Sequence, residues 1–231
     1  MWLTNSSIGR KVIMSVSGIA LILFLTFHGC MNLVALFSGD AYNMVCEMLG
    51  ANWYAVAATA VLVALIAVHF IYAIILTLQN RKARGNNRYA VTSKPEQVEW
   101  ASQNMFVLGV IVVLGLLLHL FNFWYNMMFA ELFNDGYAYF SDQLIAAGDG
   151  YSIMEKTFGN PVFTALYIIW FVALWFHLTH GFWSALQTLG WNGKIWFNRW
   201  RTIGMAYVTV LMLIFVVVAL KFAICGGCCA A

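Results

Sequence analysis

Five long apolar stretches limit what this chain can fold into more than any other feature of its sequence. A helix crosses the roughly 30 Å hydrocarbon core of a membrane with about 20 apolar residues, and each stretch reaches that length. They cover residues 11–37, 53–78, 103–130, 161–189 and 202–224. Within each stretch, apolar residues would lie on all sides of the helix rather than along one stripe. The alternation of apolar and polar residues that is typical of barrel strands is missing. The sequence predicts a single all-α domain over residues 1–231, an integral membrane bundle of five transmembrane helices.

The composition excludes several classes of protein. Hydrophobic residues make up 63% of the chain and charged residues only 9%, with a mean hydropathy of +0.80. So few charges cannot cover a water-facing surface. A soluble enzyme, a disordered tail and a nucleic-acid binder with a basic face are therefore excluded.

The charged residues between the stretches separate by sign. Ten of the twelve basic residues belong to one side: Arg10, Lys11, Arg81, Lys82, Arg84, Arg88, Lys94, Lys194, Arg199 and Arg201. Seven of the nine acidic residues belong to the other: Asp40, Glu47, Glu131, Asp135, Asp142, Asp149 and Glu155. Because basic loops stay in the cytoplasm, we expect a cytoplasmic N-terminus and an external C-terminus. The basic pair before the first stretch predicts a retained span rather than a cleaved signal peptide.

All five histidines lie inside the apolar stretches, and their depths group them. At about 1.5 Å per residue, His28 and His119 lie about 25 Å and 24 Å above the inner ends of their stretches. His69 lies at about 15 Å, while the fourth stretch offers His177 at about 20 Å and His180 at about 15 Å. An ionisable residue in hydrocarbon is a functional candidate, although a histidine that bridges two helices is the structural alternative. The depths predict an outer and an inner pair, with His177 and His180 as alternatives for the inner one.

Two imidazoles at one depth on different helices suit the two axial positions of a haem iron. Two levels then predict two haems. Zinc fits less well, because it requires four close ligands and only Cys30 accompanies any of these histidines. Gly29, Gly115 and Gly181 lie near the histidines and could each clear one face for a flat prosthetic group. Close contact between membrane helices, where glycine is also common, is the alternative.

The pattern resembles a known family, the five-helix, two-haem cytochrome b membrane subunit of succinate dehydrogenase and fumarate reductase. The likeness covers nearly the whole chain, and its most specific string is FHLTHGFWSALQTLG from Phe176 to Gly190. The other carriers are Ser17-Gly18, His28, Asn32, His69 and His119. The resemblance implies that His28 and His119 bind the distal b haem and that His69 and His177 bind the proximal one. It thereby selects His177, with Gly181 four residues later, over His180.

The resemblance also implies a function and partners. This chain would be the membrane arm of a succinate:quinone oxidoreductase or quinol:fumarate reductase in a bacterial cytoplasmic membrane. It would pass electrons between a quinone, which we expect to be menaquinone, and an iron-sulfur subunit. The iron-sulfur subunit would bind a flavoprotein subunit on the cytoplasmic side. A dimer of such heterotrimers is one possible assembly. The chain lacks a G-x-G-x-x-G fingerprint, so we expect the flavin and the dicarboxylate on a partner. Membrane lipid is a further expected partner, and nucleic acid is not.

Three other features remain weaker. Asp40 and Glu47, on the outer side, are candidates for proton exchange at a quinone site, with ordinary loop solubility as the alternative. In part of the family a glutamate stands two residues before the fourth ligand, whereas this chain has Trp175 there, so we expect that proton route to be missing. The tail cysteines Cys225, Cys228 and Cys229 form a weak metal or disulfide signal.

Two other readings compete with this one. The nearest is a two-haem cytochrome b of another respiratory complex, such as a formate dehydrogenase, nitrate reductase or hydrogenase. A transporter that relays protons through histidines is a different class. The broken helices typical of transporters are missing, because both prolines, Pro95 and Pro161, lie at loop edges.

Overall fold

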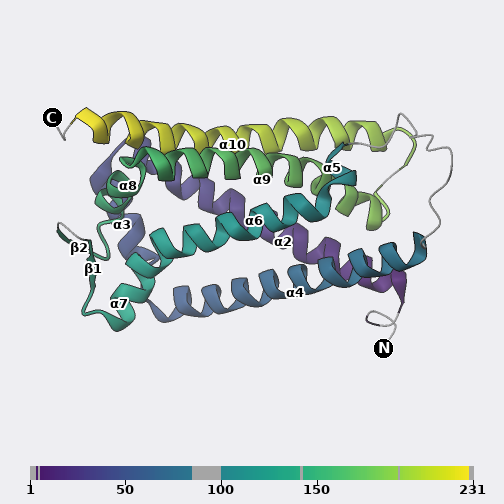
Figure 1. Cartoon of the computed structure of the whole chain (residues 1–231), viewed down its shortest axis with the longest axis horizontal. Helices are drawn as coiled ribbons and strands as arrows, with labels where there is room; N and C mark the ends of the chain where they lie inside the picture. The colour runs from purple at the N-terminus through teal and green to yellow at the C-terminus, as the bar shows by residue number, and fades with distance from the viewer. Residues whose placement is uncertain (1–3, 5, 85–99, 141–142, 192, 229–231) are drawn as a thin grey trace.

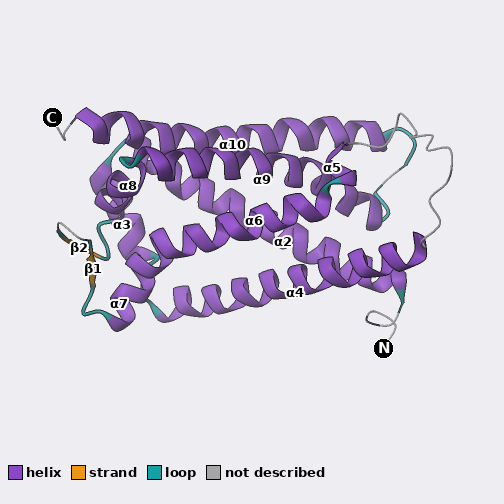
Figure 2. Ribbon diagram, viewed as in Figure 1, coloured by secondary structure: helices purple, strands orange, loops and turns teal. Residues whose placement is uncertain are grey.

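The computed structural model describes residues 4, 6–84, 100–140, 143–191 and 193–228, with backbone alone for 225–228. Five long helices dominate it (Figures 1 and 2). They are α2 (Ser7–Leu33), α4 (Trp53–Arg84), α6 (Met105–His119), α9 (Pro161–Thr188) and α10 (Trp196–Cys228). Each is long and apolar enough to cross a membrane, α2 together with a short 3-10 turn, η1 (Val34–Leu36), and α6 together with the turns that follow it. The prediction of an all-α bundle with five membrane-length helices is confirmed.

Several helices run past the apolar stretches that predicted them. α2 begins at Ser7, where Ser6 Oγ accepts a hydrogen bond of 2.9 Å from the backbone N–H of Gly9. α4 continues to Arg84 because a helix satisfies its own backbone whether or not its side chains are apolar. α9, in contrast, begins at Pro161 as predicted, because proline has no N–H to leave unpaired and Asn160 caps the helix.

The third long helix changes its winding halfway. After His119, α6 continues as a π-helical segment, η2 (Leu120–Phe129), and ends in α7 (Ala130–Phe133). A π-helix has one extra residue per hydrogen-bonded turn, is rare, and is frequently found at functional sites. Here it begins directly after a predicted metal ligand.

The short elements gather at one end of the bundle. α3 (Gly39–Met48), α7, α8 (Gly150–Phe158) and an antiparallel hairpin lie at the left end of Figure 1, opposite the N-terminus. The hairpin pairs β1 (Tyr137–Tyr139) with β2 (Leu144–Ala146). α5 (Trp100–Gln103) lies at the other end. The sequence did not predict these elements individually because none has the length or apolarity of a span.

The helices do not all pack against each other. α10 packs along α9, α8 and α2, and the most buried large side chains lie around these contacts: Tyr167, Phe222, Ile153 and Val208. α4 packs along α2, and none of the 18 residues in its most apolar stretch is buried. Within the described residues, the pairs α2 with α6 and α4 with α9 are not among those in close backbone contact. These are the helix pairs that carry the predicted histidine couples.

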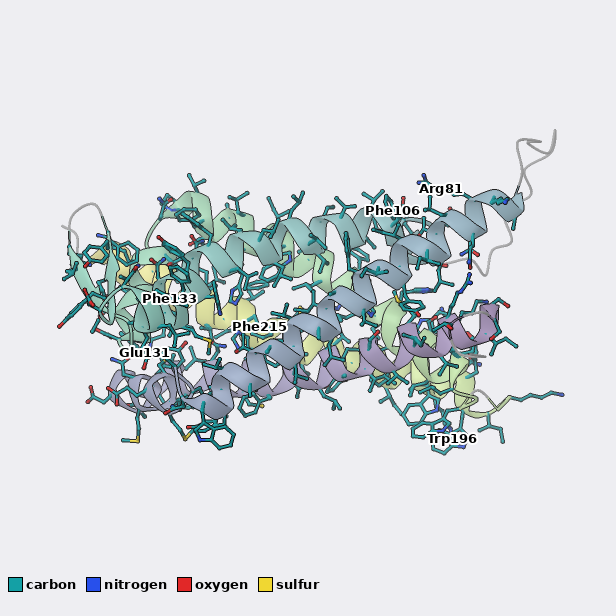
Figure 3. The ribbon with its side chains drawn as sticks, turned by 90° about the horizontal axis from the view of Figure 1, so that it is seen from below. Arg81, Phe106, Glu131, Phe133, Trp196 and Phe215 are labelled. Carbon is teal, nitrogen blue, oxygen red and sulfur yellow. The ribbon has the colours of Figure 1, made fainter. Side chains whose placement is uncertain are left out.

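The two ends of the bundle carry opposite charges, as the separation of basic and acidic residues in the sequence predicts. Arg81 lies at the end that holds α5 and the start of α10, and its guanidinium lies 5.3 Å from the centre of the Phe106 ring (Figure 3). Glu131 lies at the opposite end (Figure 3). Arg88, Lys94 and Asp142, which belonged to the charge argument, lie outside the described residues. Which end faces the cytoplasm stays a prediction.

Candidate functional site

The outer histidine pair consists of His28 on α2 and His119, the last residue of α6. Their ring centres are 5.7 Å apart and the ring planes are nearly perpendicular, at 86°. His119 also contacts Phe123, Tyr167 and Trp170, with ring centres 5.2, 6.4 and 5.9 Å away. The depth count predicted that these two histidines lie together, and the structure brings them together.

The inner pair consists of His69 on α4 and His177 on α9. Their ring centres are 6.4 Å apart, with an interplanar angle of 69°. His180, one helical turn further along α9, packs edge-on against Trp183 with ring centres 4.9 Å apart. The ring neighbour of His69 is therefore His177, the residue that the family resemblance selected and the simple depth count did not.

The spacing of each pair is close to that of two axial ligands on one metal. An imidazole nitrogen binds a first-row metal at about 2.0–2.1 Å, so the centres of two rings on opposite sides of one ion lie about 6.4 Å apart. The inner pair has a separation of 6.4 Å, and the outer pair, at 5.7 Å, is shorter. Perpendicular ring planes agree with this arrangement because each ring can rotate about its own bond to the metal.

A buried nitrogen without a partner also fits a missing group. Among the described residues, His177 Nδ1 is the one buried side-chain nitrogen or oxygen that lacks a hydrogen bond. Buried polar groups are nearly always paired, and an exception calls for an explanation such as an unseen ligand or ion. The residues present fit one haem between α2 and α6, at His28 and His119, and a second between α4 and α9, at His69 and His177.

Two of the three glycines near the histidines serve helix packing, which was the alternative to a prosthetic group. A Cβ on Gly115 would overlap the indole of Trp170, whose Nε1 donates a 3.0 Å hydrogen bond to the carbonyl of Val112. A Cβ on Gly29 would lie 3.0 Å from the side chain of Leu211 on α10. The expectation that these two glycines clear a face for a prosthetic group is wrong, because protein side chains already occupy that space. Gly181 has only Met105 nearby, at 3.9 Å.

The glycine that does face a predicted ligand is Gly18. A Cβ there would lie 3.2 Å from Cε1 of His69. Beside it, Ser17 Oγ lies 3.1 Å from His69 Nδ1. Ser17-Gly18 belongs to the family pattern, but the sequence alone predicts no role for either residue. The detectable signal was a pair of small residues on the inner half of the first stretch.

A series of buried hydrogen bonds links His28 of the outer pair to α3. Asn32 Nδ2 donates a 2.8 Å hydrogen bond to the His28 carbonyl, and Asn32 Oδ1 accepts one of 3.1 Å from the hydroxyl of Tyr42 on α3. Tyr42 in turn interacts with the thiol of Cys46. Burial raises the pKa of Cys46 to about 11 and the pKa of Tyr42 well above its usual value, so both groups stay neutral at physiological pH. This series ties the α2 turn that carries His28 to α3.

The two outer acids predicted for proton exchange are both exposed and lie at opposite ends of α3. Glu47 lines a hollow of about 350 Å³, whereas Asp40 does not. The hollow is lined by Asn43, Glu47, Glu131, Gly136, Ala146, Ala147, Gly148 and Asp149. The structure thus does not bring Asp40 and Glu47 into one site.

Two further predicted features have simple surroundings. Trp175 Nε1 donates a 2.9 Å hydrogen bond to Thr209 Oγ1 on α10, so this position is used for helix packing. Cys30 is exposed on α2 and has a free thiol. The side chains of Cys225 and Cys228, and all of Cys229, lie outside the described residues.

We found no protein-family model, curated protein or solved structure that matches this chain. The family assignment made from its residues therefore stays a prediction.

Proposed function

We propose that this chain is the membrane electron-transfer subunit of a succinate:quinone oxidoreductase or quinol:fumarate reductase. In this proposal His28 and His119 are the axial ligands of an outer b haem, and His69 and His177 those of an inner one. The observation that carries it is the meeting of histidines in two pairs, each pair joining helices that have few or no close backbone contacts within the described part of the chain. A purely structural histidine bridge would not require this separation twice.

The residues of the chain would bind, hold and insulate the two groups. Bound haem iron supplies a one-electron carrier whose potential depends on its ligands and their hydrogen bonds. The levels lie about 16 Å apart, since Ser17, which contacts His69, and His28 are separated by that rise along α2. Phe123, Tyr167 and Trp170 keep water from the ligand His119. Two such levels offer electrons a route across most of the membrane.

The remaining parts of the proposal follow from charge. The end of the bundle with Arg81, Lys194 and Arg199 would face the cytoplasm of a bacterium and meet the iron-sulfur and flavoprotein subunits, or anionic lipid. The N-terminus would then lie inside and the C-terminus outside. Quinone, with menaquinone as the first expectation, would exchange electrons near the outer haem. The hollow that includes Glu47 is the candidate route for its protons.

A spectrum of the purified protein tests the proposal. We expect two b haems per chain by the pyridine haemochromogen assay and a reduced-minus-oxidised difference spectrum of low-spin, bis-imidazole type. In membranes, succinate should reduce these haems, and flavin should co-purify with the chain. A protein expressed with adequate haem supply that binds none would refute the proposal. Two haems that formate or hydrogen reduces, or nitrate oxidises, and that do not respond to succinate would indicate another respiratory complex.

A further inference from the structure

Ser17 lies where it can control the chemistry of His69. It is 3% exposed on α2, and its Oγ is 3.1 Å from His69 Nδ1 across the α2–α4 contact. The same hydroxyl donates a 3.1 Å hydrogen bond to the carbonyl of Met14. The His69 ring also interacts with the Met14 carbonyl. One serine and one backbone oxygen of α2 therefore lie beside the His69 ring.

Counting protons links the direction of the Ser17 hydrogen bond to the tautomer of His69. A serine hydroxyl has one proton to donate, and the Met14 carbonyl, which can only accept, lies 3.1 Å from Ser17 Oγ. When the hydroxyl donates to Met14, Ser17 Oγ accepts from Nδ1, and Nδ1 is then the protonated nitrogen. A neutral imidazole has one N–H, so in this arrangement Nε2 of His69 keeps its lone pair.

We propose that Ser17 is a positioning residue that fixes the Nδ1–H tautomer and the ring orientation of His69, so that Nε2 is presented to a metal. The inference rests on the proposed function for the identity of that metal, but the tautomer itself does not depend on it. Histidine ligands usually donate their second N–H to an oxygen, which orients the ring and makes the ligating nitrogen more basic. Ser17 supplies that oxygen for His69.

The neighbouring glycine supports the same role. A side chain at Gly18 would come within 3.2 Å of His69 Cε1, so its absence lets the α2 backbone close on the ring. Ser17 can reach Nδ1 only at that short approach. His177, the other member of the pair, has no such partner at Nδ1 among the described residues. Among the described residues, the inner pair thus has one imidazole with a hydrogen-bond partner at Nδ1 and one without.

The consequence is a specific dependence of the inner metal on Ser17. Without the hydroxyl, Nδ1–H donates less strongly and Nε2 becomes a weaker donor to the metal. A weaker donor stabilises the oxidised iron less, so the reduction potential of the inner haem should rise. Loss of an outer-shell partner typically costs about tenfold or more in metal affinity. A tenfold change in the preference for oxidised iron corresponds to about 59 mV.

The test compares four proteins: wild type, Ser17→Ala, Ser17→Thr and the matched control Ser15→Ala. Ser15 is also buried on α2, at 7% exposure, and is two residues from Ser17. Potentiometric titration and electron paramagnetic resonance follow the two haems separately. We expect Ser17→Ala to lower the preference of the inner haem for oxidised iron about tenfold, which raises its reduction potential by about 59 mV. The potential of the outer haem should stay unchanged. Ser17→Thr keeps the hydroxyl and should restore the wild-type potential, and Ser15→Ala should have no effect.

Nitrogen NMR of the apoprotein with ¹⁵N-labelled histidine tests the tautomer without haem. We expect His69 in wild type and Ser17→Thr to show Nδ1 protonated, and Ser17→Ala to show a mixture of tautomers. The inference is wrong if wild-type His69 is protonated at Nε2, or if Ser17→Ala leaves both the tautomer and the inner potential as in wild type. A wild-type protein with the expected tautomer but no haem would instead refute the proposed function alone.

Discussion

His28 and His119 meet ring to ring although the helices that carry them do not pack closely. Their ring centres are 5.7 Å apart, while α2 and α6 are not among the close helix pairs of the described chain. Helices in a membrane associate mainly through small residues and close backbone approach. Two large polar rings between helices that approach so little agree with the haem proposed for this position.

Replacing single histidines should remove one haem at a time. We expect His28→Ala and His119→Ala to lose the outer haem and keep the inner, and His69→Ala and His177→Ala to do the reverse. The measure is haem per chain, with difference spectra to identify the haem that remains. His180→Ala is the matched control on α9 and should keep both. Loss of the inner haem in that control, with His177→Ala unaffected, would reverse the site assignment.

Filling Gly115 should disturb the outer pair alone. The new Cβ of Gly115→Ala would overlap Trp170, which must move and strain its bond to the Val112 carbonyl. Overpacking of this kind typically costs about 1–3 kcal/mol. We expect a lower thermal midpoint in detergent and an altered outer-haem spectrum, with the inner haem unchanged. Gly193→Ala, where no atom of the described residues lies within 4 Å of the added Cβ, should behave as wild type.

Removing the Tyr42 hydroxyl should destabilise the protein at the contact between α2 and α3. In Tyr42→Phe, Asn32 Oδ1 loses the 3.1 Å bond that it accepts and stays buried. An unsatisfied buried acceptor costs about 1–3 kcal/mol. Thermal unfolding of the detergent-solubilised protein measures the loss. Tyr139→Phe, on the exposed face of the hairpin, is the control, and equal midpoints for the two variants would show that the series of hydrogen bonds from Tyr42 to His28 contributes nothing.

The thiol of Cys46 should react slowly until the pH is high. Only the thiolate reacts, and burial raises the pKa of this group to about 11, so deprotonation lags behind that of a free cysteine, whose pKa is about 8.5. At pH 8 we expect alkylation to be about 100-fold slower or more than at an exposed cysteine, and to accelerate as the pH rises towards 11. The protein would carry Cys46 as its only cysteine. Asp40→Cys, without Cys46, provides the exposed control on the same helix, and similar rates at pH 8 would contradict the prediction.

The orientation in the membrane can be read with an impermeant thiol reagent. In a chain without native cysteines, Lys194→Cys should react only in inverted vesicles, because the basic end is predicted to face the cytoplasm. Asp135→Cys, at the turn before the hairpin, should react only in right-side-out vesicles. The opposite pattern would reverse the predicted topology, and with it the side on which soluble subunits bind.

The sequence by itself determined the class of fold and the depth of the histidines. Both depend on local quantities, namely the length of each apolar run and the rise per residue of a helix, so His28 and His119 could be matched without any tertiary information. The choice between His177 and His180 needed more, because one helical turn is smaller than the error in locating the end of a span.

Only the tertiary structure decided what lies across the helices from each residue. Gly29 and Gly115 looked like clearance for a prosthetic group, yet side chains of Leu211 and Trp170 occupy that space. The roles of Ser17, which meets His69 from a helix 52 residues away in sequence, and of Tyr42 were also invisible in one dimension. Such contacts depend on how helices rotate and approach each other. In a membrane, where every face of a span is apolar, hydropathy contains almost no information about that rotation.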